Sequence, residues 1–331
     1  MERGAIGQTR GMSTPLTTVS KLAVVGAGSV GSSVAYAALL RGSARTIALY
    51  DVDTAKVDAE VLDLAHGSAL AGGSSVIGGD DITAVAGADV VVITAGARQK
   101  PGQTRLDLAG TNVDILRSLL PQLLEQAPDA VFILVTNPAD VLAYAAARIA
   151  GLPEGRVMSS GTVLDTSRLR WRLATRLGVA ARSVHASMVG EHGDSEFGLW
   201  SSATIGQVPI RQWRDPSGEI ALDEEALATL EREVAGAAYA VIQGKGATNL
   251  AIGVASARIA EAIIRDEHAV LPVSTPLNGW HGFDDVAMSM PTIVGRTGAV
   301  RRLEVPMDEQ EEQQMRASAE AMRTVQADLG L

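Results

Sequence analysis

The stretch KLAVVGAGSVG, residues 21–31, decides the fold. It opens with a short apolar run typical of a buried strand, and the residues that follow it, 32–40, predict a helix. Gly26, Gly28 and Gly31 have the spacing at which a strand turns tightly into a helix and the backbone can approach a pyrophosphate. Glycines at this spacing also occur in ordinary turns, but a strand before them and a helix after them favour a dinucleotide site.

The strand-like pattern recurs through the first half of the chain. Three further apolar runs alternate with stretches of helical spacing, and they lie at residues 46–50, 90–93 and 131–135. Strands that are apolar throughout and alternate with helices indicate a parallel sheet covered on both faces. We therefore expect an α/β fold in which residues 21–160 form a Rossmann domain, a doubly wound parallel sheet.

The second half of the chain has a different pattern of helical and strand-like stretches. Stretches of helical pattern lie at about 164–173, 223–242, 255–265 and 308–327. A glycine-containing turn occupies residues 190–194, and β-like stretches continue to Trp213. These features predict a C-terminal α+β domain over residues 161–331, which would hold the substrate, with the boundary near Ser160.

Composition excludes several classes of function. The chain has 331 residues, a formal net charge of -10 and a pI near 5.0, which argues against a nucleic-acid partner. It has no cysteine, which removes disulfides and thiolate metal sites, and we predict no metal site and a cytoplasmic location. No apolar run approaches the roughly 18 residues of a membrane span. Residues 1–20 lack the apolar stretch of a secretory signal and are expected to form a flexible leader.

Asp51 indicates which dinucleotide is bound. It ends the second apolar run, twenty residues beyond Gly31. A carboxylate there can accept hydrogen bonds from the adenosine ribose hydroxyls and repels a 2′-phosphate. The next residues are Val52 and Asp53, so no arginine follows directly to pair with such a phosphate. NAD is therefore expected rather than NADP, with a solvated acidic residue at a strand end as the ordinary alternative.

Three polar stretches are candidates for the chemistry. Residues 94–105 contain glycine and proline and lie between a strand and a helix, where ligands bind in such sheets. Asp165 and Arg168 share one face of a predicted helix, and His192 lies in the glycine-containing turn. Taken singly, each has an ordinary explanation, such as a solvated histidine or a surface ion pair worth under about 1 kcal/mol.

The chain resembles the L-lactate and malate dehydrogenase family from about Lys21 to the C-terminal helix. Within that family it is most similar to the bacterial lactate dehydrogenase branch. The stretches that carry the resemblance are GAGSVG, ITAGARQKPGQTRLDL, VTNPADVL, SGTVLDTSRLR, SVHASMVGEHGDSEFGLWS, GKGAT and DEHAVLPVS. Their combination is far more specific than any one of them.

The resemblance implies that four side chains carry the chemistry. His192 matches the proton shuttle of the family, and an imidazole suits that role because its unperturbed pKa near 6.5 makes both forms accessible. Asp165 would accept the other ring N–H, and Arg168 would hold the substrate carboxylate with two parallel hydrogen bonds. Arg105, in an active-site loop at about 96–108, would polarise the substrate carbonyl once the loop closes.

The resemblance also extends the cofactor site. Asn137 would lie near the nicotinamide ribose, Arg98 on the phosphate side and Ile252 beneath the nicotinamide ring. The predicted NAD-binding set is therefore Gly26, Gly28, Ser29, Val30, Gly31, Asp51, Arg98, Asn137 and Ile252.

The resemblance implies pyruvate and lactate as substrates, and Gln99 is the residue that favours them. Malate dehydrogenases place an arginine there to pair with the second carboxylate of oxaloacetate, whereas a neutral Gln leaves that carboxylate buried and unpaired. Thr248 matches a pocket wall suited to a methyl group. The predicted substrate-binding set is Gln99, Arg105, Asn137, Arg168 and Thr248. Malate dehydrogenase is the alternative that a one-residue register error would produce.

Arg170 and His185 match positions at which bacterial relatives bind fructose 1,6-bisphosphate across a subunit interface. Basic groups suit a bisphosphate, and a shared site would shift the assembly equilibrium. A surface helix arginine and a strand-end histidine are the ordinary alternatives. The resemblance further implies a homotetramer.

Two other classes stay open at this stage. NAD-dependent glycosidases resemble the family distantly, but they use a metal held by a Cys/His set, and this chain has no cysteine. A non-catalytic NADH-binding module would be expected to lose the proton shuttle or the carboxylate clamp. Here Arg105, Asp165, Arg168 and His192 are all present.

Overall fold

The computed structural model describes residues 20–97 and 105–331, and for residues 105 and 106 it describes the backbone alone. The predicted leader at 1–20 therefore lies almost wholly outside the described residues. So does the middle of the predicted active-site loop at 96–108.

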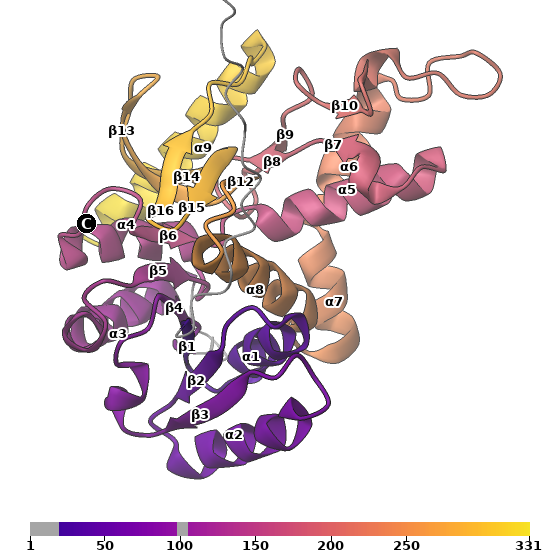
Figure 1. The fold of residues 1–331 in the computed structure, drawn as a ribbon. Coiled ribbons are helices and arrows are strands. Elements are labelled where there is room, and N and C mark those ends of the chain that lie inside the picture. Colours follow the sequence, from indigo (N-terminus) through magenta and orange to yellow (C-terminus); the bar gives the residue numbers. More distant parts are fainter. Residues whose placement is uncertain (1–19, 98–104) are drawn as a thin grey trace, which may run out of the picture.

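One eight-stranded sheet forms the centre of the molecule (Figure 1). Its strand order is β14-β13-β6-β5-β4-β1-β2-β3, and the pairs from β3 to β6 are all parallel. The six parallel strands are β1 (Lys21–Val25), β2 (Thr46–Tyr50), β3 (Ser75–Gly79), β4 (Val90–Ile93), β5 (Val131–Leu134) and β6 (Val157–Ser159). The order 3-2-1-4-5-6 is that of a Rossmann sheet, so the predicted doubly wound parallel sheet is confirmed.

Helices cover both faces of this sheet because neighbouring strand residues point to opposite sides. Leu22 and Val24 of β1 pack into one core with helices α1 (Ser29–Arg41), α2 (Thr54–Ser68) and α8 (Leu250–Ile264). Ala23 and Val25 pack into the other core with α3 (Arg105–Gln126) and α4 (Ala139–Ala150). A short 3-10 helix, Ile82–Val85, precedes β4.

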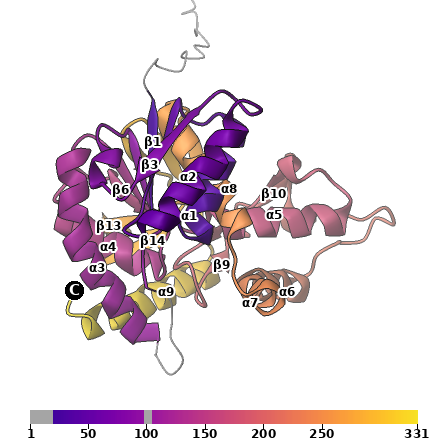
Figure 2. The ribbon, with the colours of Figure 1, turned by 90° about the horizontal axis from the view of Figure 1, so that it is seen from below.

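The second half of the chain builds an α+β part beside the sheet. Helices α5 (Val163–Leu177), α6 (Glu224–Ala235) and α7 (Ala237–Lys245) lie to one side of it in both views (Figure 2). Five short strands lie between α5 and α6: β7 (Val184–His185), β8 (Met188–Val189), β9 (Phe197–Gly198), β10 (Thr204–Ile205) and β11 (Val208–Pro209). Two 3-10 helices, Ala181–Ser183 and Ile210–Gln212, lie in the same stretch. A separate core joins α5, α6 and these strands through residues such as Leu173, Trp200 and Leu230.

The C-terminal strands tie the two halves together. Strand β13 (Ser274–Trp280) pairs antiparallel with β6, and β14 (Phe283–Ser289) pairs with β13, so this hairpin extends the sheet of the first half. Three more strands form a small sheet, β12 (Ala269–Leu271), β15 (Thr292–Gly295) and β16 (Gly298–Arg302). Helix α9 (Glu309–Asp328) begins with a capping box of Asp308 and Glu311 and packs its methionines against β14 and β9.

Two predicted helices have different bounds in the structure. The stretch at 223–242 is not one helix, because it breaks at Gly236, a residue type that weakens a helix interior. The helix predicted at 255–265 begins earlier, at Leu250. Gly253 lies in its first turn, where glycine is required because a Cβ would lie 2.7 Å from the backbone and Cβ of Ser33 on α1.

In the part of the chain that the structure describes, no helix combines the length and apolar character needed to cross a bilayer.

Candidate active site

The glycine-rich turn joins β1 to α1 as the sequence predicts. Gly26 has φ of 103°, a conformation that favours glycine, and a Cβ on Gly31 would lie 1.8 Å from the Gly26 carbonyl oxygen. Gly28 differs, because a Cβ there would meet only the Lys56 amine, at 3.8 Å. Packing within the described chain therefore demands glycine at 26 and 31, whereas the space at 28 is open for a ligand that approaches the backbone.

Asp51 reaches the same turn from the end of β2. Its Oδ2 accepts a hydrogen bond from the Ala27 N–H at 2.6 Å, and its Oδ1 accepts one from the Asp53 N–H at 3.1 Å. The amine of Lys56 lies 4.0 Å from Asp51 Oδ2. The carboxylate is thus held at the mouth of the glycine-rich turn.

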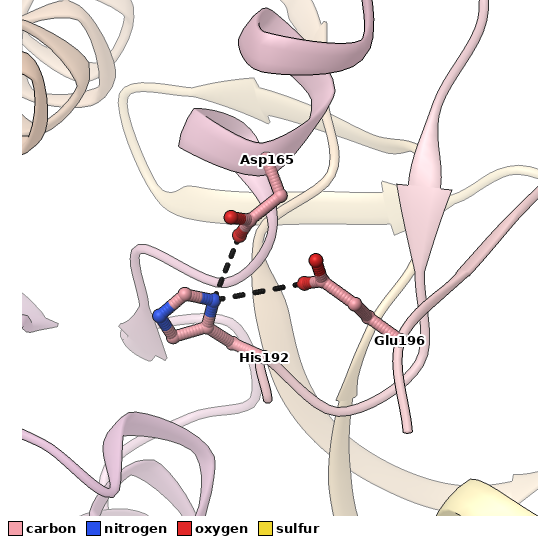
Figure 3. A group of neighbouring side chains, drawn as sticks. All are labelled: Asp165, His192 and Glu196. Atoms are coloured by element: carbon pink, nitrogen blue, oxygen red, sulfur yellow. Dashed lines mark hydrogen bonds and ion pairs between the residues drawn. The ribbon is translucent and has the colours of Figure 1, made fainter. Parts of the chain in front are cut away.

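A second constellation forms around His192, in the turn between β8 and β9. His192 Nδ1 lies 2.7 Å from Asp165 Oδ2, and Asp165 is almost fully buried in the first turn of α5 (Figure 3). The other oxygen of the same carboxylate, Oδ1, accepts a hydrogen bond from Arg168 Nη1 at 2.6 Å. Asp165 therefore joins the histidine and the arginine directly.

Backbone contacts fix the turn that carries the histidine. The His192 N–H donates to Asp140 Oδ2 at 2.6 Å, and the Oδ1 of the same buried aspartate accepts from Ser159 Oγ at 2.8 Å. Asp140 lies in the first turn of α4, which follows β5. In Figure 3 the Nε2 of His192 lies on the far side of the ring from Asp165, so it is the nitrogen left to face a substrate.

These two groups of residues converge on one edge of the sheet. The glycine-rich turn follows β1, Asp51 follows β2 and Asp140 follows β5, and parallel strands end at a common edge. The start of α5 lies at the same edge, because α5 begins four residues after the end of β6, which is parallel to β5. The histidine group and the glycine-rich turn therefore lie at the same edge of the sheet.

The charges of the site favour a protonated histidine. Burial acts to lower the pKa of His192, but the adjacent carboxylates, Asp165 foremost, hold that pKa well above its ordinary value. Burial acts to raise the pKa of Asp165, yet His192 and Arg168 outweigh it and keep that pKa below its usual range. An imidazolium facing a carboxylate, with a guanidinium beside them, can donate a proton next to an anionic substrate.

Comparison with protein families assigns both halves of the chain to one family. The family model described as the lactate/malate dehydrogenase NAD-binding domain matches residues 20–159, and the model of the α/β C-terminal domain of the same family matches residues 162–328. The chain belongs to the lactate/malate dehydrogenase family. The NAD-dependent glycosidase and the non-catalytic module are therefore not supported, and the chain is an NAD-dependent dehydrogenase.

Relatives within this family share most of the chain. It is 49% identical over 311 residues to an L-lactate dehydrogenase of Bifidobacterium animalis subsp. lactis, covering 94% of this chain and 97% of the relative. It is 44% identical to an L-lactate dehydrogenase of a Synechococcus species, covering 92% and 98%. A solved lactate dehydrogenase from a Medee basin deep-sea metagenome library superimposes with a TM-score of 0.90 at 36% identity, covering 95% and 99%.

The family's cofactor, NAD, fits the residues of this chain. The open space at Gly28 admits a pyrophosphate, and the N-terminus of α1 has no side-chain cap that would compete for its N–H groups. Ser29 is exposed at the start of that helix, and Val30 and Ile252 both pack at the margin of the core shared by α1 and α8. The expectation of NAD is confirmed by the family match.

The structure places some of the other predicted residues and leaves others undescribed. Asn137 is exposed after β5, and its carbonyl accepts from Asn112 Nδ2 at 2.9 Å. Thr248 lies between α7 and α8, where its neighbour Asn249 donates to Ser33 Oγ of α1 at 3.0 Å. The remaining three lie outside the described residues, or have only their backbone described: Arg98, Gln99 and Arg105.

The two residues predicted to bind a bisphosphate lie on adjoining elements. Arg170 of α5 donates from Nε to the Ala186 carbonyl at 2.8 Å, and His185, next to Ala186, is exposed on β7. Helix α5 therefore lies against this strand, with two basic groups on adjoining elements.

Sequence reasoning missed three polar residues that shape the site. Asp140 lies in the first turn of α4, where acidic residues are common, so its residue type does not set it apart in the sequence. Glu196 opens the apolar run Phe197 to Trp200 and turns out to be buried beside His192. Asn112 links Ala97 and Asn137 through its side-chain amide, and nothing in its sequence neighbourhood indicates this.

Proposed function

We propose that this chain interconverts pyruvate and L-lactate with NADH and NAD, with His192 as the proton donor and acceptor. The observation that carries the proposal is the shared carboxylate of Asp165, which contacts His192 Nδ1 at 2.7 Å and Arg168 Nη1 at 2.6 Å. The names of the relatives support lactate over malate, since those reported above are lactate dehydrogenases.

Each residue then has a distinct task in the reduction of pyruvate. Arg168 binds the substrate carboxylate through its guanidinium, of which the Asp165 ion pair uses one N–H. Bound NADH supplies a hydride to the carbonyl carbon. His192 gives its Nε2 proton to the carbonyl oxygen and becomes neutral, and Asp165 stabilises the imidazolium before that transfer. In the reverse direction neutral His192 accepts the hydroxyl proton of lactate.

Four further roles rest on the resemblance to the family. Arg105 polarises the carbonyl, Asn137 contacts the keto oxygen and the nicotinamide ribose, and Thr248 bounds the methyl group. Ile252, at the margin of the core beside Val30, provides an apolar support for the nicotinamide ring. These assignments complete a site that binds a keto acid against the cofactor at the sheet edge.

The choice between pyruvate and oxaloacetate depends on Gln99. We expect kcat/KM for pyruvate to exceed that for oxaloacetate by about 100-fold or more, because a second carboxylate would be buried without a partner. Gln99→Arg should reverse this ratio, while Gln103→Arg, which adds the same charge four residues away, should leave pyruvate preferred. Steady-state NADH oxidation with both acids measures the ratios. Preference of the wild-type chain for oxaloacetate would rule out the proposed substrate.

Arg170 and His185 are proposed to bind fructose 1,6-bisphosphate as an activator. A saturating amount of it should lower the pyruvate concentration needed for half-maximal rate several-fold and increase the fraction of assembled protein. His185→Gln should abolish this response, whereas Arg176→Gln, an exposed change near the end of α5, should keep it. Rates and sedimentation velocity with and without the bisphosphate decide the matter. An unchanged half-saturation and oligomeric state would refute the assignment.

A homotetramer and a cytoplasmic location are part of the same proposal. Exposed apolar side chains on α7 and α8, Ile242, Leu250 and Val254, offer surface for contact between subunits. The absence of cysteine from the sequence suits a reducing compartment.

A further inference from the structure

A second carboxylate approaches the nitrogen that Asp165 contacts. Glu196, which immediately precedes β9, places Oε2 3.8 Å from His192 Nδ1, whereas Asp165 Oδ2 lies 2.7 Å from it. Figure 3 shows the two carboxylates reaching the ring from different segments of the chain. The distance to Glu196 is that of an ion pair and is longer than a hydrogen bond.

Glu196 is buried, and its near oxygen has no other partner. The residue is 8% exposed, and among the described residues no group forms a hydrogen bond with its Oε2. Asp165 differs, since its two oxygens are taken by Arg168 and His192. A buried carboxylate oxygen without a hydrogen bond is costly unless a positive charge faces it or it carries a proton. His192 is the group that provides that charge.

The pair of Asp165 and Arg168 does not by itself supply a full negative charge to face the imidazolium of His192. The positive charge of Arg168 partly offsets the negative charge of Asp165, because the Asp165 carboxylate is paired with both Arg168 and His192. Glu196 therefore contributes a second negative charge that faces the ring. Burial raises the pKa of Glu196 to about 7, and His192 acts in the opposite direction. Among the described side chains, the titratable and charged groups near His192 are Asp165 and Arg168 from α5, Asp140 from α4, and Glu191 and Glu196 from its own turn.

We propose that Glu196 is a positioning residue that sets how strongly His192 holds its proton, by facing the imidazolium with a second carboxylate. The inference deepens the proposed function and rests on it for the kinetic consequence. The ionised carboxylate stabilises the imidazolium that pyruvate reduction requires. When the histidine has given up its proton, the same buried carboxylate loses its counter-charge and takes up a proton more readily.

The consequence is a shift of the pH profile with a definite sign. Pyruvate reduction needs protonated His192, so kcat/KM for pyruvate falls as pH rises through the pKa of that histidine. Glu196→Gln keeps the size of the side chain and removes its charge, which lowers the pKa of His192. The alkaline fall should therefore move to lower pH by about 1 unit, in line with the effect of one nearby opposite charge. The acid limb of lactate oxidation, which needs neutral His192, should move in the same direction.

The experiment compares three full-length proteins: the wild-type chain, Glu196→Gln and Glu231→Gln. Glu231 is also a partly buried carboxylate next to β9, but it accepts from the Gly198 N–H and from Trp200 Nε1. Two readouts are taken: pH profiles of kcat/KM for pyruvate and lactate, and the NMR titration of the His192 ring without substrate. The sequence has five histidines, and His192→Gln assigns the resonance.

We expect the His192 titration midpoint to be lower in Glu196→Gln alone. In the same variant, the alkaline fall of pyruvate reduction and the acid limb of lactate oxidation should both move to lower pH. A merely structural role would instead lower the rate equally at every pH and leave the titration in place. An unmoved His192 titration, or an equal shift in Glu231→Gln, overturns the inference. The NMR readout separates the two proposals, because it can show the shift even if the chain proves unable to reduce pyruvate.

Discussion

His192→Ala is expected to lower kcat/KM for pyruvate by roughly 10³-fold while the affinity for NADH stays within about twofold of the wild-type value. A positioned acid contributes about 10²–10⁴ in rate, and its loss removes the proton that the carbonyl oxygen needs. The described contacts of His192 are to Asp140, Asp165 and Glu196, and none of these belongs to the glycine-rich turn. Steady-state rates and a fluorescence titration with NADH measure the two quantities.

The matched control is His281→Ala, which removes an exposed histidine bonded to Glu304 on the hairpin side of the sheet. It should leave both the rate and the NADH affinity unchanged. A fall of NADH affinity in proportion to the rate in His192→Ala would show that the residue holds the cofactor and does not act as the proton donor.

Arg168→Gln is expected to lower kcat/KM for pyruvate by about 10²–10⁴, mostly through a higher KM. Two charge-assisted hydrogen bonds to the substrate carboxylate would be lost, each worth about 1.5–3 kcal/mol. Arg168→Lys should recover only part of the loss, because an ammonium cannot offer two parallel donors. Saturation curves for pyruvate with each variant give the values.

Arg172→Gln is the control for this second prediction. It lies one turn further along α5, where it pairs with Glu233 at the surface. It should keep the wild-type KM. If Arg168→Gln retained the wild-type KM for pyruvate, the carboxylate would have to be bound elsewhere and the proposed orientation of the substrate would be wrong.

The elements that the sequence predicts well are those with a strong local pattern. Strands β1, β2, β4 and β5 are short apolar runs with glycine or polar residues at their ends, and helix packing on both faces requires that pattern. The hairpin of β13 and β14 was not predicted. Pro276 and Gly279 interrupt β13, and its pairing with β6 joins residues far apart in the chain.

In the candidate site, too, residues with a local sequence pattern are predictable and those that depend on tertiary packing are not. Asp165 and Arg168 share a helix face by their spacing, and the structure brings His192 to them as the resemblance implies. Asp140 and Glu196 act through contacts that exist only once α4, α5 and the turn before β9 are packed together. Their residue type alone does not distinguish them from surface carboxylates, so only the three-dimensional arrangement shows their relation to His192.

The most direct measurement is a crystal structure of the protein with NADH and oxamate, an unreactive analogue of pyruvate. The oxamate carbonyl oxygen should lie about 3 Å from His192 Nε2, with its carboxylate paired to the Arg168 guanidinium. The dihydropyridine ring should lie between the analogue and the side of the site formed by Ile252. Oxamate bound with its carboxylate away from Arg168, or with its carbonyl oxygen out of reach of His192, would contradict the account.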